Sequence, residues 1–327
     1  MIAGLATPEG TDRFRRRFPA LDGAGHFRRI ASAGGLWLSS IGLGTSQGAE
    51  DDAADQGYEE AIRLALASGC NVFDTAISYR EERSERALGR ALARAFTEGL
   101  AARDEVFVAT KGGLKGEISA GQLAPSRVNL GLLAVDLYFL HNPETRLSEL
   151  SRPELEERLA GAFAELEAAA DRGEIGLYGV ATWDGLRVPP SDPGHLGLAR
   201  LAEIAGPRFR AVELPLNIAF PEALVAPTQE LDGVRIPALA AARKLALSVF
   251  TSGSIQKRLG YSVPPAIAQV FPDLATDAQR VLQFTRSAPG VAVALVGMGR
   301  ADHVAENLAV AAVPPAGLET FQWIFGG

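Results

Sequence analysis

Eight short runs of apolar and β-branched residues recur along the chain, and amphipathic helical stretches separate them. Continuous apolar strands that alternate with helices are typical of a parallel sheet covered by helices. Eight such units in one chain favour a closed (β/α)8 barrel of the TIM type, and the sequence therefore predicts this α/β fold. The predicted strands are residues 38–45, 71–76, 106–111, 135–141, 176–182, 211–217, 247–252 and 291–297.

The helices between the strands are marked by their periodicity and their end signals. Residues 57–68 end at Gly69, which suits the left-handed position after a helix. Residues 153–171 repeat apolar side chains at spacings of four, four and three, which makes one apolar stripe. Near the C-terminus, Thr276 or Asp277 is suited to cap a further helix.

A doubly wound sheet is the alternative architecture. Such a sheet is expected to have a G-x-G-x-x-G turn after its first strand, but residues 42–48 read GLGTSQG, which does not match that spacing. Residues 1–35 are rich in Arg and Gly, and we expect them to form a leader or a short cap over one end of the fold. Residues 36–327 are then expected to form a single barrel domain.

Composition narrows the class of ligand. A hydrophobic content of 47% with 22% charged residues is typical of a globular protein with ample core, and a net charge of −7 argues against a nucleic-acid partner. The single cysteine, Cys70, fits a reducing compartment, and neither a signal peptide nor an apolar run of roughly 20 residues is found. We expect a cytoplasmic protein with a small-molecule ligand, no membrane partner and, because no cluster has metal-ligand spacing, no metal.

Four chemically distinct side chains follow neighbouring predicted strands. Asp74, Lys111 and His141 end the second, third and fourth strands, and Tyr79 lies on the loop after the second. Each residue alone has an ordinary structural explanation, such as capping for Asp74 or packing for Tyr79. In a barrel, however, the C-terminal ends of the strands form one rim, where active sites lie. We therefore expect the four side chains to converge on one cavity.

These four groups suit proton delivery to a carbonyl oxygen. A free phenol, with a pKa of about 10, is a poor acid at neutral pH, but a neighbouring ammonium favours the phenolate. Lys111 would supply that charge, and Asp74 would hold the ammonium in place. His141 would orient the substrate oxygen by a hydrogen bond.

Several segments resemble the signature segments of the aldo-keto reductases: FDTAISY, SERALGRAL, VFVATKGG and VDLYFLHNPE. The resemblance extends from about Ile41 to Asn307. It implies a (β/α)8 barrel that binds NADPH or NADH in an extended pose. It also implies a catalytic tetrad of Asp74, Tyr79, Lys111 and His141, with Tyr79 as general acid in reduction and general base in oxidation.

The segment LVGMGRADHVAEN, residues 295–307, is similar to the family segment that follows the eighth strand and surrounds the adenosine 2′-phosphate. Backbone amides beyond a glycine turn suit an anion, and Arg300 would add a fork-shaped cation, which favours NADPH. The cofactor contacts that we predict are Thr45, Asp74, Thr182, Glu213, Ser252, Gly297, Met298, Gly299, Arg300, His303, Glu306 and Asn307.

The chain departs from the family pattern at the nicotinamide end. Many relatives have Ser-Asn after the fifth strand, where this chain has Ala181 and Thr182, and Gln on the sixth strand, where it has Glu213. The aromatic residue that stacks beneath the nicotinamide is replaced around Ser252, with Phe250 as a substitute.

The leading hypothesis is a nicotinamide-dependent reductase of aldehydes or ketones, or a dehydrogenase of the corresponding alcohol or sugar. Tyr79, His141 and Trp183 would contact the substrate. The alternative is a non-catalytic NADP(H)-binding regulatory protein on the same fold. A third hypothesis is a lyase or aldolase in which Lys111 forms a Schiff base.

Overall fold

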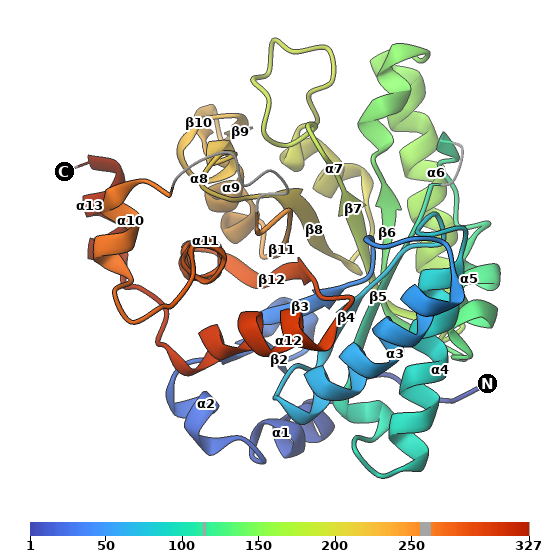
Figure 1. Ribbon diagram of the computed structural model, residues 1–327. Helices are drawn as coiled ribbons and strands as arrows, with labels where there is room; N and C mark the ends of the chain where they lie inside the picture. The colour runs from blue at the N-terminus through green and yellow to red at the C-terminus, as the bar shows by residue number, and fades with distance from the viewer. Residues whose placement is uncertain (114–115, 256–262, 327) are drawn as a thin grey trace.

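Eight parallel strands close into a barrel in the order β11-β12-β3-β4-β5-β6-β7-β8, which confirms the predicted fold (Figure 1). The computed structural model describes residues 1–113, 116–255 and 263–326. Each predicted strand run overlaps one barrel strand. The barrel strands are β3 (Ile41–Gly44), β4 (Val72–Asp74), β5 (Phe107–Gly112), β6 (Val135–His141), β7 (Ile175–Ala181), β8 (Phe209–Pro215), β11 (Ser248–Ser252) and β12 (Val291–Gly297).

Helices surround the barrel, and their ends follow the local sequence. Helix α3 begins after Asp51, whose carboxylate accepts a hydrogen bond from the amide of Ala54, and it is closed by Gly69 in the left-handed region at φ 90°. Thr276 caps α11 as predicted. The helices and the short β9–β10 pair are α3 (Asp52–Ala67), α4 (Arg83–Thr97), α5 (Leu123–Leu130), α6 (Arg152–Asp171), α7 (Leu198–Ile204), α8 (Glu222–Val225), β9 (Gln229–Leu231), β10 (Val234–Ile236), α9 (Ala238–Lys244), α10 (Pro265–Val270), α11 (Asp277–Ser287), α12 (Ala301–Leu308) and α13 (Leu318–Gly326).

The N-terminal segment covers one end of the barrel. It forms α1 (Pro8–Arg15), α2 (Pro19–Gly23) and a hairpin of β1 (Phe27–Ile30) and β2 (Leu36–Ser39), and Figure 1 shows α1 and α2 along the lower edge. Apolar side chains of the hairpin pack in one cluster with the first residues of β4 and β5. The hairpin therefore closes the N-terminal end of the strands, and a division at residue 36 stays a prediction.

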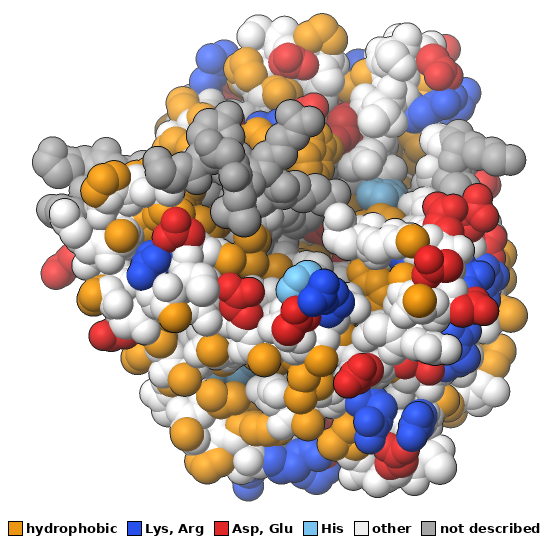
Figure 2. Space-filling view, in the orientation of Figure 1, with side chains coloured by type: hydrophobic (Ala, Val, Ile, Leu, Met, Phe, Trp, Pro, Cys, Tyr) orange, Lys and Arg blue, Asp and Glu red, His pale blue; other side chains and the backbone are white. Residues whose placement is uncertain are grey.

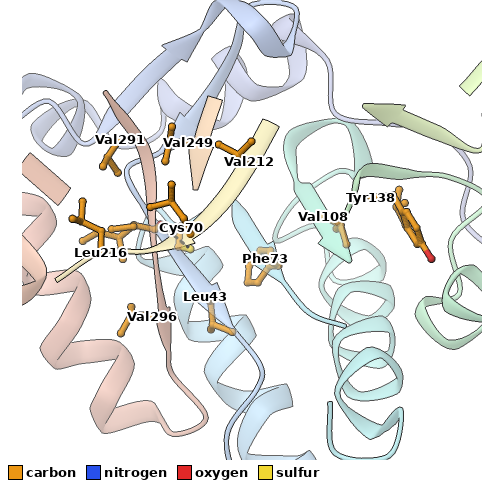
Figure 3. Packing of buried hydrophobic residues seen from close by; sticks show 14 of the residues in the cluster. Leu43, Cys70, Phe73, Val108, Tyr138, Val212, Leu216, Val249, Val291 and Val296 are labelled. Carbon is orange, nitrogen blue, oxygen red and sulfur yellow. Dashed lines mark hydrogen bonds between the residues drawn. The ribbon is translucent and has the colours of Figure 1, made fainter. Parts of the chain in front are cut away.

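Side chains that alternate along the strands form two hydrophobic cores, one inside the barrel and one between the sheet and the helices. In β5, Phe107 and Ala109 belong to the cluster inside the barrel, whereas Val108 belongs to the cluster between the sheet and the helices. Figure 3 shows side chains of this outer cluster, Phe73, Val108 and Tyr138 among them. Because successive side chains of a strand point to opposite faces, Lys111, two residues beyond Ala109, also points into the barrel.

Among the residues that the structure describes, no helix combines the length and the apolarity that crossing a membrane requires.

The inner core makes a testable contribution to stability. The ring of Phe107 stacks on that of Phe250 at 5.9 Å between centroids, and both side chains are almost fully buried. Truncating a buried Phe costs roughly 3–5 kcal/mol through lost burial and the cavity left behind. We therefore expect Phe107→Ala to lower the free energy of unfolding by about that amount in urea titrations. Val234→Ala, at an exposed position, should change it by less than about 0.5 kcal/mol, and similar losses for both variants would contradict this packing.

Candidate active site

A buried ion pair lies at the C-terminal end of the barrel. Lys111 Nζ donates to both carboxylate oxygens of Asp74 at 2.5 Å and to the backbone oxygen of Thr75 at 3.2 Å. The side chain of Lys111 is fully buried, and that of Asp74 is 6% exposed. The pair forms because Asp74 ends β4 and Lys111 lies near the end of the adjacent strand, β5.

Glu213 on β8 is a second carboxylate against the same ammonium. Its Oε2 lies 3.2 Å from Lys111 Nζ and accepts no hydrogen bond from any residue that the structure describes. Burial raises the pKa of Glu213 to about 8; Lys111 opposes this shift and Asp74 adds to it. Burial acts to lower the pKa of Lys111, but the two carboxylates outweigh it and raise that pKa overall. The ammonium therefore stays charged.

Tyr79 and His141 lie above this ion pair. Their rings meet edge to face, with centroids 5.9 Å apart, and Lys111 Nζ is 5.4 Å from the centre of the Tyr79 ring. Burial raises the pKa of Tyr79, and Lys111 opposes that shift without reversing it. Burial and the charge of Lys111 lower the pKa of His141 to about 4, so the imidazole is neutral near pH 7.

Hydrogen bonds from a buried arginine stabilise the turn that carries Tyr79. The three residues that follow Tyr79, which are Arg80, Glu81 and Glu82, have positive φ, a backbone region that residues other than glycine rarely adopt. The buried guanidinium of Arg80 stabilises this turn, because it donates to the backbone oxygen of Ala49 at 2.7 Å and to the carboxylate of Asp55 at 2.6 Å.

The SERALG segment secures the adjacent backbone. Ser84 donates to the backbone oxygen of Thr45, and the buried carboxylate of Glu85 accepts from Thr110 on β5. These residues position the site, although sequence analysis assigned them no role beyond the family motif.

A cavity of about 460 Å³ opens above the ion pair. Its wall contains a second unpartnered buried group, since the hydroxyl of Thr182 has no hydrogen-bond partner among the described residues. Of the predicted site residues, Tyr79, His141, Thr182, Trp183, Glu213 and Ser252 line this cavity. Ala181, one of the departures from the family pattern, also lines it. Sequence analysis missed the other lining residues, which are Ser46, Asn142, Asn217, Phe220 and Gly253. Asn142 directly follows β6, so its place after His141 was a usable signal.

A second cavity, of about 320 Å³, shares Ser46 and Gly253 with the first. It extends toward α12, where Figure 2 shows basic, acidic and histidine side chains grouped together. The predicted residues that line it are Gly297, His303, Glu306 and Asn307. Two adjoining cavities provide one extended groove from the ion pair to α12, which suits an elongated ligand such as a dinucleotide.

Some predicted contacts lie outside both cavities. The hydroxyl of Thr45 is buried and donates to the backbone oxygen of Asp74, and Met298 is fully buried. Gly299 does not line either cavity, and the side chain of Arg300 is 69% exposed and forms an ion pair with Asp302. Phe250, proposed as an aromatic substitute, packs inside the barrel.

In the described part of the chain, no group of three or more His, Cys, Asp and Glu side chains is arranged to hold a metal ion.

The fold and the site together define a (β/α)8 barrel with a buried ion pair beneath a cavity at the C-terminal ends of its strands. Residues 40–188 match the model of the Aldo/keto reductase family. An aldo-keto reductase of Mycobacterium avium is 32% identical over 146 residues, 44% of each chain, so the match spans less than half of that relative. One from Bombyx mori is 34% identical over 116 residues, 33% of this chain and 36% of that protein. These matches cover less than half of the chain, and over that part the chain is similar to the aldo-keto reductases.

Solved structures of aldo-keto reductases have the same fold over nearly the whole chain. The structure from Klebsiella pneumoniae in complex with NADP and acetate has a TM-score of 0.68 at 19% identity and covers 92% of this chain and 95% of that one. The Bombyx mori structure in complex with NADP has a TM-score of 0.65 at 19% identity and covers 91% of each chain. At this identity the likeness concerns the barrel alone.

The raised pKa of Glu213 predicts a pH-dependent stability. In the folded chain Glu213 holds its proton up to about pH 8, whereas in the unfolded chain it loses that proton near pH 4.5. The stabilisation that Glu213 contributes to the folded state is therefore complete below pH 4.5 and is lost as the pH rises to 8. We expect Glu213→Gln to remove this loss, which has a maximum slope of about 1.4 kcal/mol per pH unit. Urea titrations at pH 5, 6, 7 and 8 measure it. Glu230→Gln, at an exposed position, is the control, and parallel profiles for Glu213→Gln and the wild type would refute the assignment.

Proposed function

We propose that the chain is an NADP(H)-dependent oxidoreductase that reduces an aldehyde or a ketone, or oxidises the corresponding alcohol or sugar. The observation that carries the proposal is the buried Asp74–Lys111 pair beneath Tyr79, at the floor of a cavity continuous with a groove to α12. The match of residues 40–188 to the Aldo/keto reductase model supports it, and so does the likeness of the fold to aldo-keto reductases solved in complex with NADP.

The residues of the groove fit such a cofactor. Neither the hydroxyl of Thr182 nor Glu213 Oε2 makes a hydrogen bond with a described residue, so both could bind polar groups of a nicotinamide, and Ser252 lines the same cavity. Gly297, Glu306 and Asn307 would hold the adenosine end. When bound, the nicotinamide supplies a hydride for reduction or accepts one in oxidation.

Tyr79 is the proposed general acid. A carbonyl oxygen in the cavity accepts hydrogen bonds from Tyr79 and from the neutral imidazole of His141, whose rings meet at the wall. The raised pKa keeps the phenol protonated near pH 7, so its proton is available when negative charge develops on that oxygen. Lys111 then stabilises the phenolate, and in oxidation the same phenolate removes the proton from an alcohol.

The charge of Lys111 argues against the lyase or aldolase hypothesis. A Schiff base requires a neutral amine, but Asp74 and Glu213 hold Lys111 as an ammonium and raise its pKa. Treatment with borohydride and substrate should therefore leave no adduct on Lys111.

Tyr79→Phe separates catalysis from binding. Because the variant keeps the ring and loses only the hydroxyl, we expect turnover to fall at least about tenfold, within the range of lost acid–base catalysis, while NADPH still binds. Steady-state rates on a panel of carbonyl compounds and fluorescence titration with NADPH measure the two effects. Tyr138→Phe is the matched control, since that hydroxyl is buried outside both cavities without a partner. More than about a tenth of the wild-type rate would remove Tyr79 from this role, and a wild type that binds NADPH without turnover would favour the regulatory alternative.

Arg300 tests the choice of nucleotide. We expect Arg300→Ala to weaken NADPH more than NADH, because only NADPH carries the 2′-phosphate that this guanidinium would contact. Asp302→Asn should have the opposite effect, since it releases Arg300 from its ion pair. Dissociation constants for both nucleotides measure this. Arg94→Ala, an exposed arginine paired with Glu98, is the control, and equal losses for NADPH and NADH would refute the assignment.

A further inference from the structure

Glu213 adds a carboxylate to a site whose ammonium already has a partner. Lys111 Nζ is 2.5 Å from both oxygens of Asp74, and the more distant Glu213 Oε2, at 3.2 Å, has no hydrogen-bond partner among the described residues. Glu213 is 5% exposed and lines the cavity above the pair. With all three groups ionised, the trio carries a net charge of −1.

The surroundings of Glu213 make it the group that changes charge near neutral pH. Its neighbours in the sheet, Ala181 on β7 and Phe250 on β11, carry no titratable group. The charged and titratable side chains that face it come from β4, β5, β6 and the turn after β4, and they are Asp74, Lys111, His141 and Tyr79.

These neighbours keep one charge state each between pH 6 and 9. Lys111 remains an ammonium opposite Asp74, His141 is neutral because its pKa is about 4, and Tyr79 is protonated because its pKa is raised. Glu213, with a pKa of about 8, gains its negative charge in this range.

We propose that Glu213 selects the redox state of the cofactor: its carboxylate favours the oxidised, positively charged nicotinamide ring over the reduced, neutral ring, and its protonation removes that preference. This inference rests on the proposed function. A glutamine at this position would have the same shape and no charge.

Proximity within the cavity supports the proposal. A nicotinamide whose reacting carbon meets a carbonyl held by Tyr79 must lie in the cavity that Glu213 also lines. Charges a few ångströms apart in a partly dry site interact strongly, and Lys111 is already neutralised by Asp74. The oxidised ring would thus add a second positive charge near Glu213, beside the ammonium of Lys111 that it shares with Asp74. By linkage, a tenfold preference for the oxidised form makes the bound couple about 30 mV more reducing.

The test is the ratio of the dissociation constants of NADPH and NADP+, measured by fluorescence titration from pH 6 to pH 9. In the wild type we expect the ratio to rise by about tenfold or more as Glu213 ionises. In Glu213→Gln it should stay constant. The phosphate groups are common to both nucleotides, so their own titration cancels in the ratio. Glu230→Gln, outside both cavities, should follow the wild type.

Linkage provides a second measurement that needs no variant. If the oxidised ring binds the carboxylate form, NADP+ must release a proton from the protein near pH 8, and NADPH must release less. Calorimetry in two buffers of different ionisation enthalpy measures this release, and it keeps the proposal testable if Glu213→Gln fails to fold.

The outcomes separate this inference from the proposed function. A wild-type ratio that is constant with pH, with both nucleotides bound, would overturn the role of Glu213 and leave the proposed function intact. A ratio that still rises in Glu213→Gln would assign the effect to another group and overturn the inference. Failure of the wild type to bind either nucleotide would overturn the proposed function and the inference with it.

Discussion

The buried contact between Lys111 and the carboxylate of Asp74 is the interaction on which the rest of the site depends. A charge without a partner costs several kcal/mol in a protein interior, so neither residue is tolerated there without the other. Adjacent parallel strands bring the two together at the end of the barrel where the strand backbones end and a cavity opens. The same contact fixes an ammonium beneath Tyr79, so the ring lies over a defined positive charge. The arrangement of the strands therefore creates the ion pair that positions the charge beneath Tyr79.

The barrel and the ion pair could be predicted from the sequence because both follow from strand alternation. Runs such as VFVATK fix which residues are strands, and a period of two fixes that Lys111 shares its face with Phe107 and Ala109 inside the barrel. The residue types at the rim suggested that Tyr79 delivers a proton, and the family resemblance implied the same role. The structure then placed Tyr79 and His141 edge to face above the pair, consistent with that role.

The pKa values of the site residues could not be predicted with equal success, because they depend on burial and on distances between residues far apart in the chain. The sequence suggested that Lys111 would lower the pKa of Tyr79, but in the fold burial outweighs this attraction and the pKa is raised. The negative charges of Asp74 and of Glu213, which lies 102 positions beyond Lys111 and faces the same ammonium, add to the effect of burial. Residues such as Arg80, which steadies the turn after β4, were missed for a similar reason: their role is a set of long-range hydrogen bonds without a local pattern.

A site that holds two carboxylates against one ammonium has a consequence for both directions of the proposed reaction. While Glu213 is protonated, the trio is neutral, and Lys111 is free to favour the phenolate that reduction leaves on Tyr79. Once Glu213 ionises, its charge opposes the phenolate, since both are negative and face the same ammonium. The same charge favours an oxidised nicotinamide ring. Ionisation of one carboxylate thus destabilises the phenolate of Tyr79 and stabilises the oxidised nicotinamide ring, so its effects on the two products of reduction have opposite signs. A neutral glutamine at this position would exert neither effect.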